Sequence, residues 1–104
     1  MERLVDLTLV SVEYETDEIG QQIEDEEVTR TLLATLHSVS RQEWSMGAQM
    51  SLNPEGMAKL AHSGDYQDEE YLEIDGKRFA IYRTYPTDDG GIELYYRKII
   101  RGNT

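Results

Sequence analysis

The residues that could support catalysis are few and lie far apart in the sequence. The two histidines, His37 and His62, fall in unrelated segments, and there is no cysteine to act as a nucleophile or thiolate ligand. The chain contains no Gly-x-Ser-x-Gly, phosphate-binding-loop or His-Glu-x-x-His pattern. Carboxylates are abundant, but they cluster in polar runs rather than forming a pair in two different environments. These patterns favour a binding or assembly protein over an enzyme, and we expect no catalytic residue.

The densest acidic run could be imagined as a metal site. It spans residues 15–27 and holds seven acids around Gly20. A calcium loop of the EF-hand type needs acids at alternate positions about a central glycine, and that spacing is absent. We therefore expect neither a metal nor another cofactor. We interpret the run as a long exposed loop or hairpin tip that is solvated, or that repels DNA.

A third candidate is an aromatic and basic surface in the C-terminal part of the chain. Four tyrosines and two arginines could hold a peptide or oligonucleotide, as small OB-like or SH3-like barrels do: Tyr82, Tyr85, Tyr95, Tyr96, Arg83 and Arg97. Tyrosine pairs across strands are more often structural. The net charge of −11 also opposes tight nucleic-acid binding, since an acidic protein gains nothing from counterion release. Peptide or oligonucleotide binding is therefore the alternative interpretation.

Length and composition indicate a single domain over residues 1–104. The mean hydropathy is −0.62, no run approaches the ~18 apolar residues of a membrane span, and the N-terminus lacks a signal-peptide pattern. We expect a protein made in a cytoplasm, with no membrane partner. Residues 1–27 hold ten acids and one base, whereas residues 76–104 hold six bases and three acids. This asymmetry suits head-to-tail contact between copies, although ordinary solvated faces would also explain it.

The last third of the chain predicts three antiparallel strands. Asp75-Gly76 is a strong hairpin signal, because both central residues of a type I′ turn need positive φ. Alternating β-branched and aromatic residues flank it over 71–74 and 77–86, and a third run over 92–100 follows the turn at 88–91. We expect this meander to be the nucleus on which the earlier segments pack.

Two further strands are predicted over residues 4–14 and 28–39. In the first strand, apolar residues occur on both faces, so we expect Val5, Leu7 and Leu9 to contact another subunit; an irregular barrel strand is an equal alternative. In the second, three residues on one face are expected in the core: Leu32, Ala34 and Leu36.

The middle of the chain predicts one short helix. Ser40 and Glu43 form a capping box, which starts a helix at Arg41 that ends near Gly47. We expect Trp44 to plug one end of a barrel. A loop over 48–55 and a strand over 56–63 would follow. Together the elements predict a mainly β protein: a small antiparallel β-barrel with one short helix and long loops.

Three blocks in order resemble one known family. They are SVSRQEWSMGAQMSLNP at 38–54, EIDGKRFAIYRTY at 73–85 and IELYY at 92–96. Together with the first strand and the turn at 17–20, they resemble the head-closure proteins, or stoppers, of long-tailed bacteriophages and prophages, which join the head to the tail. The resemblance covers nearly the whole chain.

The resemblance implies a structural virion protein at the head–tail junction, assembled in the host cytoplasm. Such a protein forms a ring, expected to be of twelve copies, below the portal and its adaptor. It closes the channel on packaged double-stranded DNA without binding it tightly, and offers the attachment surface for the tail-completion protein. A tail-terminator or adaptor of the same junction is an alternative. As the loop that closes the channel we prefer Ala48, Gln49, Met50, Ser51, Leu52 and Asn53 over the acidic run at 15–27. As subunit or partner contacts we expect Val5, Leu7, Leu9, Arg83, Arg97 and Lys98.

Overall fold

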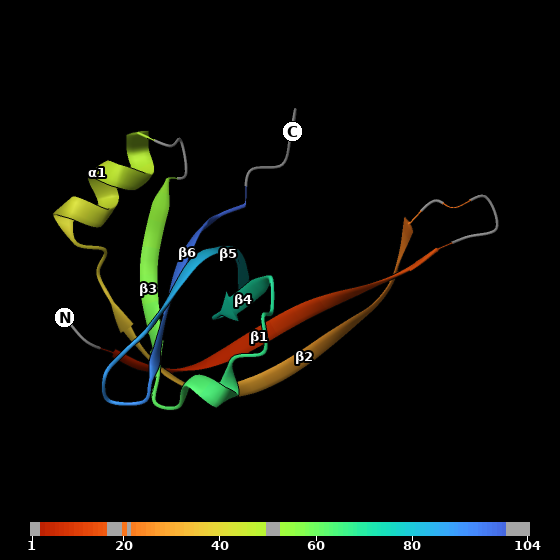
Figure 1. The fold of residues 1–104 in the computed structure, drawn as a ribbon, viewed down its shortest axis with the longest axis horizontal. Helices are drawn as coiled ribbons and strands as arrows, with labels where there is room; N and C mark the ends of the chain where they lie inside the picture. Colours follow the sequence, from red (N-terminus) through yellow and green to blue (C-terminus); the bar gives the residue numbers. More distant parts are fainter. Residues whose placement is uncertain (1–2, 17–19, 21, 50–52, 100–104) are drawn as a thin grey trace.

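A computed structural model describes residues 3–16, 20, 22–49 and 53–99. Within these ranges, six antiparallel strands close into a barrel in the order β1-β2-β3-β6-β5-β4, and one short helix lies outside it (Figure 1). The elements are β1 (Arg3–Thr16), β2 (Gln22–His37), α1 (Arg41–Gln49), β3 (Pro54–Leu60), a 3₁₀ turn (Ser63–Asp65), β4 (Tyr71–Ile74), β5 (Lys77–Pro86) and β6 (Ile92–Lys98). The predicted β-barrel with one short helix is confirmed.

The C-terminal meander forms as the sequence predicts. Asp75 and Gly76 have φ values of 53° and 79°, which place both turn residues in the left-handed region of a type I′ turn. β4 then pairs with β5, and β5 with β6. The inward alternation also holds, because Ile92, Leu94 and Tyr96 are all buried. The meander is half of a closed barrel, since β4 pairs with β1 and β6 pairs with β3.

β3 is a strand, although its residue types include good helix formers. Its buried residues alternate with more exposed ones, as a strand with one face in the core requires. Tyr96 packs closely against the backbone of β3 at Gly56, where an added Cβ would lie 2.5 Å from the Tyr96 hydroxyl oxygen. The glycine therefore lets β3 and the large Tyr96 side chain share the barrel interior.

The core cluster takes its buried residues from five strands, and β5 packs Phe79 and Ile81, which are partly buried, against it. Its buried members are Leu7, Leu9, Ala34, Ala58, Leu60, Leu72, Ile74, Ile92, Leu94 and Tyr96. Leu32 and Leu36 pack against this cluster, as predicted. The expectation that Leu7 and Leu9 contact another subunit is wrong, because both are fully buried in this chain's own core. Val10 and Val12, from the other side of β1, are also buried within the chain.

β1 and β2 continue well beyond the barrel as a paired hairpin. β1 pairs with β4 only from Thr8 to Val10, and β2 pairs with β3 only from Thr35 to His37. We call the outer part, residues 11–16 and 22–28, the arm; its strands pair with each other from Ser11 opposite Val28 to Thr16 opposite Gln22. At ~3.3 Å per residue, its β1 half extends about 20 Å, and Figure 1 shows it leaving the body of the molecule. The run at 15–27, interpreted from the sequence as a long exposed loop or a hairpin tip, is strand over residues 15–16 and 22–27.

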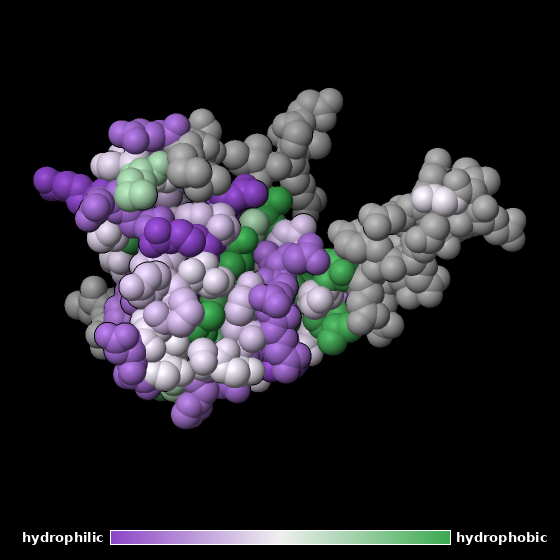
Figure 2. Space-filling view, viewed as in Figure 1, coloured by the Kyte–Doolittle hydropathy of each residue, from purple (hydrophilic) through white to green (hydrophobic). Residues whose placement is uncertain are grey.

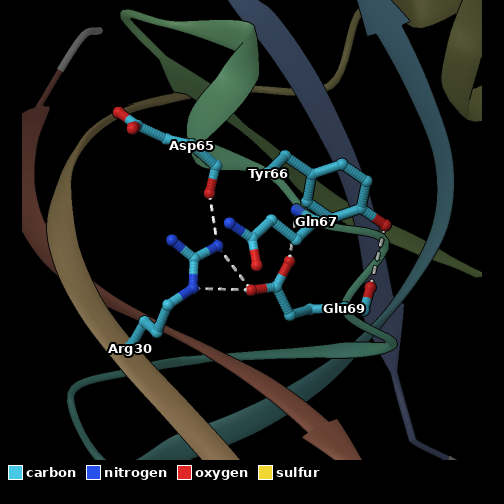
Figure 3. A network of polar contacts seen from close by, with 5 residues as sticks. All are labelled: Arg30, Asp65, Tyr66, Gln67 and Glu69. Atoms are coloured by element: carbon cyan, nitrogen blue, oxygen red, sulfur yellow. Dashed lines mark hydrogen bonds and ion pairs between the residues drawn. The ribbon is translucent and has the colours of Figure 1, made fainter.

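A polar cluster, which we call the clasp, lies at the root of the arm (Figure 3). The Arg30 side chain on β2 donates from Nε to a Glu69 carboxylate oxygen at 3.0 Å and also to the carbonyl of Asp65. The other Glu69 oxygen accepts the backbone N–H of Gln67 at 2.6 Å, and the Tyr66 hydroxyl donates to the Glu69 carbonyl at 2.8 Å. Glu69 is only 4% exposed. The clasp holds the connection between β3 and β4 against β2 at Arg30. This part of β2 lies outside the stretch from Thr35 to His37 that pairs with β3.

Candidate functional site

A groove of about 570 Å³ lies between α1 and the β5–β6 wall of the barrel. Its lining comes from the helix and its cap on one side and from two strands on the other: Ser40, Gln42, Glu43, Met46, Arg83, Tyr85 and Tyr95. Residues about forty positions apart in the sequence therefore form one surface. We take this groove and its exposed rim as the candidate site.

The helix begins where the sequence predicts. The Ser40 hydroxyl accepts the backbone N–H of Glu43 at 3.1 Å, which satisfies one of the unpaired donors of the first turn. The Glu43 side chain turns away toward β5, where it accepts the Tyr82 hydroxyl at 2.9 Å and pairs with Arg83 at 2.7 Å. Glu43 is 8% exposed, so a paired and nearly buried carboxylate fastens α1 to the barrel.

The tyrosines of this wall are held as neutral donors. Burial, reinforced by the bond to Glu43, raises the pKa of Tyr82 above its usual value. Burial and the bond from Tyr95 to Glu93 likewise raise the pKa of Tyr95. The Arg83 guanidinium lies over the Tyr95 ring at 4.5 Å from its centroid. These groups form a fixed polar anchor under the groove, suited to holding a surface in place.

The rim of the groove is apolar and open to solvent. Met46 and Tyr85 line the groove and are exposed there, whereas Trp44, 56% exposed, lies elsewhere on α1. The prediction that Trp44 plugs the barrel is wrong, because α1 packs through other residues. A Cβ at Gly47 would lie 2.2 Å from Pro54 Cγ, so Gly47 is the point of contact with β3. Trp44 follows the buried Glu43 by one residue, about 100° around the helix, and so it faces outward.

A second, smaller cavity of about 230 Å³ lies where the first residues of β1 approach the β4–β5 turn. Arg3, Asp75 and Lys77 supply charged groups, and Phe79 and Tyr96 supply ring surface. The Phe79 and Tyr96 rings pack together with centroids 5.0 Å apart. Because Tyr96 is buried in the core, the six aromatic and basic residues of the alternative interpretation do not share one face.

The segment from Ala48 to Asn53, which we preferred as the loop that closes the channel, begins within the helix. Ala48 and Gln49 are the last two residues of α1, two residues beyond the predicted end at Gly47. Met50, Ser51 and Leu52 lie outside the described residues, and Asn53 has a φ of 52° just before β3. The helix extends because Gly47 packs against Pro54 instead of capping the C-terminus.

The remaining predicted contact residues differ in their surroundings. Val5 packs partly buried against the core. The Arg83 guanidinium pairs with Glu43 and lies over the Tyr95 ring. Lys98 is largely exposed, and its Nζ lies 3.8 Å from Glu55 Oε2. The Arg97 Nε is buried without a hydrogen-bond partner, while its Nη1 donates to the Lys98 carbonyl at 3.5 Å.

Two exposed residues were missed by the sequence interpretation. Leu4 and Leu33 project from the outer face of β1 and β2. The only sequence signal was the placement of Leu33 among threonines on the face opposite Leu32, Ala34 and Leu36. On the face seen in Figure 2, apolar residues (green) show through a mostly polar surface in narrow strips.

Among the described residues, no group of three or more His, Cys, Asp or Glu side chains is arranged to hold a metal ion. No helix there is both long and apolar enough to cross a bilayer.

Comparison with known proteins supports the fold. No family model matches the sequence, and no curated protein matches it. The structure is similar to the solution structure of protein SF1141 from Shigella flexneri 2a, with a TM-score of 0.66 and 20% sequence identity. The match covers 92% of this chain and 93% of that chain. The same barrel, with nearly the same extent, therefore occurs in a protein of very different sequence.

Proposed function

We propose that this protein is a head-closure component of a tailed bacteriophage or prophage. In this role it forms a ring under the portal and adaptor, closes the channel after DNA packaging, and offers a surface to the tail-completion protein. The three sequence blocks motivate the proposal, and the small closed barrel with one peripheral helix is the architecture that it requires. The function is structural, with sister copies and neighbouring rings as its partners.

The arm is the observation that carries this proposal. A two-stranded hairpin is at best marginally stable in water by itself. Within the part of the chain that the structure describes, the strands of the arm have no third strand beside them after Val10. A projection of about 20 Å with two open edges is what an assembly element needs, because another molecule can complete it.

The charge of the arm suits a channel that DNA must pass. Residues 13–27 contain eight acids and no base. A segment with this charge repels phosphate, which suits passage of DNA without tight binding. We therefore assign channel closure to the arm in place of the segment from Ala48 to Asn53, whose first two residues are helical. The base of the arm is fixed to the barrel by Arg78, which donates to both Glu27 oxygens, at 2.7 and 3.0 Å.

Shortening the arm tests the proposal in phage particles that carry this chain. The variant replaces residues 14–25 by Asn-Gly, so that Glu13 and Glu26, which are paired in the ladder, flank a two-residue turn and the barrel is kept. We expect rings to form and heads to fill, but DNA to leak, which nuclease sensitivity and electron microscopy of the heads would show. Replacing Ser45, an exposed residue of α1, by Ala is the matched control and should retain DNA. Absence of the chain from purified particles would overturn the proposal.

A further inference from the structure

We propose that the smaller cavity, which we call the end cavity, binds a small aromatic carboxylic acid. Its walls come from the first residues of β1, β3 and β5 and from the last residues of β2, β4 and β6. In an antiparallel barrel these ends of the strands meet at the same end of the barrel. The site lies within a single chain, so it goes beyond the proposed function and does not depend on it.

The Tyr96 hydroxyl is the group that points to a ligand. Tyr96 is only 6% exposed, and its ring packs in the core against Phe79. Within the part of the chain that the structure describes, its hydroxyl has no hydrogen-bond partner. A phenylalanine would fill the same core space without an unpaired polar group. The hydroxyl therefore indicates a partner from outside the chain.

The hydroxyl lies on the cavity side of the Tyr96 ring. Tyr96 and Glu55 both line the end cavity. Burial raises the pKa of Tyr96, and the charge of the Glu55 carboxylate raises it further. Because a phenol ionises at its oxygen, this effect places the hydroxyl near Glu55. The hydroxyl stays protonated near neutral pH, so it can donate a hydrogen bond to a carboxylate.

One cation at the rim of the end cavity lacks a counterion. Arg3 pairs with Asp75 at 3.5 Å. Glu55 has Lys98 at 3.8 Å as its partner. Lys77 is exposed on the same rim and has no ion-pair partner among the described residues. The uncompensated charge at the cavity is thus positive, and it favours a ligand with an anionic group.

The rest of the wall suits one aromatic ring. Leu36 and Ile74 supply aliphatic surface. The rings of Phe79 and Tyr96 are inclined at 54° to each other. The cavity holds about 230 Å³, and an apolar cavity of about 150 Å³ is large enough for benzene. A single ring with one carboxylate therefore fits, with the carboxylate toward Lys77 and the Tyr96 hydroxyl and the ring against Phe79.

Titration of the purified full chain with benzoate, followed by NMR, tests the site. Saturable amide shifts should centre on residues around the end cavity, such as Gly56, Lys77 and Phe79, with a Kd of about 1 mM. Benzyl alcohol keeps the ring without the charge and should bind about tenfold more weakly. The absence of saturable shifts at these residues, or equal binding of the two compounds, would overturn the proposal.

Tyr96→Phe isolates the contribution of the hydroxyl, because it removes one oxygen and keeps the ring. It should weaken benzoate binding by about tenfold. Without benzoate, the midpoint of thermal unfolding should be unchanged or higher, since the hydroxyl has no partner among the described residues. A lower midpoint would show that the hydroxyl has a structural partner in the chain, which contradicts the assignment.

Lys77→Gln tests the cation at the rim. It should weaken benzoate binding by about threefold, as expected for an exposed ion pair. Arg41→Gln is the matched control, because Arg41 is exposed on α1, outside the cavity lining, and the charge change is identical. The control should bind benzoate as the unsubstituted chain does. Equal losses in the two variants would assign the attraction to net charge and not to this cavity.

Discussion

The two halves of the β1–β2 hairpin share the same strands and the same ladder but differ in what surrounds them. In the barrel half, β4 and β3 flank the pair, and Leu7, Leu9 and Ala34 are buried. In the arm, β1 and β2 pair only with each other among the described residues, and six of its thirteen residues are acids, although Val12 is still buried. Backbone hydrogen bonds are equally available to both halves. The difference indicates that closure around a core stabilises the barrel half, whereas a two-stranded hairpin by itself is at best marginally stable.

The largest effect should come from the barrel half. Leu9→Ala should lower the free energy of unfolding by about 2–5 kcal/mol, because it removes buried methyl groups and leaves a cavity. Leu33→Ala, on the exposed face of β2, should change it by about 0.5 kcal/mol or less. Urea unfolding of the two variants measures the difference. Equal losses would mean that Leu9 is stabilised by another molecule and not by this core.

The next largest effect on the free energy of unfolding should come from the boundary between the barrel and the arm. Arg30→Met should lower the free energy of unfolding by about 2–3 kcal/mol, because it leaves the Glu69 carboxylate buried without its cation. Arg3→Met removes an exposed pair with Asp75 and should cost about 0–1 kcal/mol.

A double variant sharpens the test of the clasp. Adding Glu69→Gln to Arg30→Met should recover part of the loss in thermal unfolding, since no charge is then left unpaired. If the double variant loses the sum of the two single effects, the two side chains act independently and the clasp does not couple them.

The helix cap should have a smaller effect. Ser40→Ala should destabilise the protein by about 1 kcal/mol, because the Glu43 N–H loses its acceptor in the first turn. Ser45→Ala, in the exposed middle of the same helix, should be neutral or slightly stabilising. Thermal unfolding followed by circular dichroism distinguishes them. A loss at Ser45 as large as that at Ser40 would show that the cap is not the cause.

The smallest effect should be a local pH dependence of the arm. The hydrogen bond from Arg78 lowers the pKa of Glu27. A carboxyl whose pKa is lowered by folding stabilises the folded state above its ordinary pKa range, and this stabilisation is lost as the pH falls through the lowered value. The protection of the amides in residues 11–16 against hydrogen exchange should therefore fall, relative to that of residues 4–9, between neutral pH and pH about 3.

Glu27→Gln is the matched variant for this measurement. It keeps the shape of the side chain but removes its titration, so arm amides should already exchange faster at neutral pH, and the change with pH should be smaller. An unchanged pH dependence in this variant would assign the effect to the other arm acids.

Local spacing in the sequence was enough to predict much of the body. Asp75-Gly76 specifies its turn because few residues adopt positive φ there, and Ser40 specifies the helix start because its hydroxyl reaches its own first turn. The inward alternation of Ile92 and Leu94 follows from the period of a strand. Each of these signals depends on residues within a few positions of one another.

Tertiary structure decided what depends on distant partners. β1 is apolar on both sides, so only closure with β4 determined that Leu7 and Leu9 face the core. The acidic arm is extended because its two strands supply each other's hydrogen bonds, which residue preferences do not show. Trp44 faces outward because the neighbouring Glu43 finds Tyr82 and Arg83, some forty residues away. Contacts between residues so far apart in the sequence leave no local pattern in it. These contacts determine which residues are exposed on the surface, and the proposed assembly depends on those surfaces.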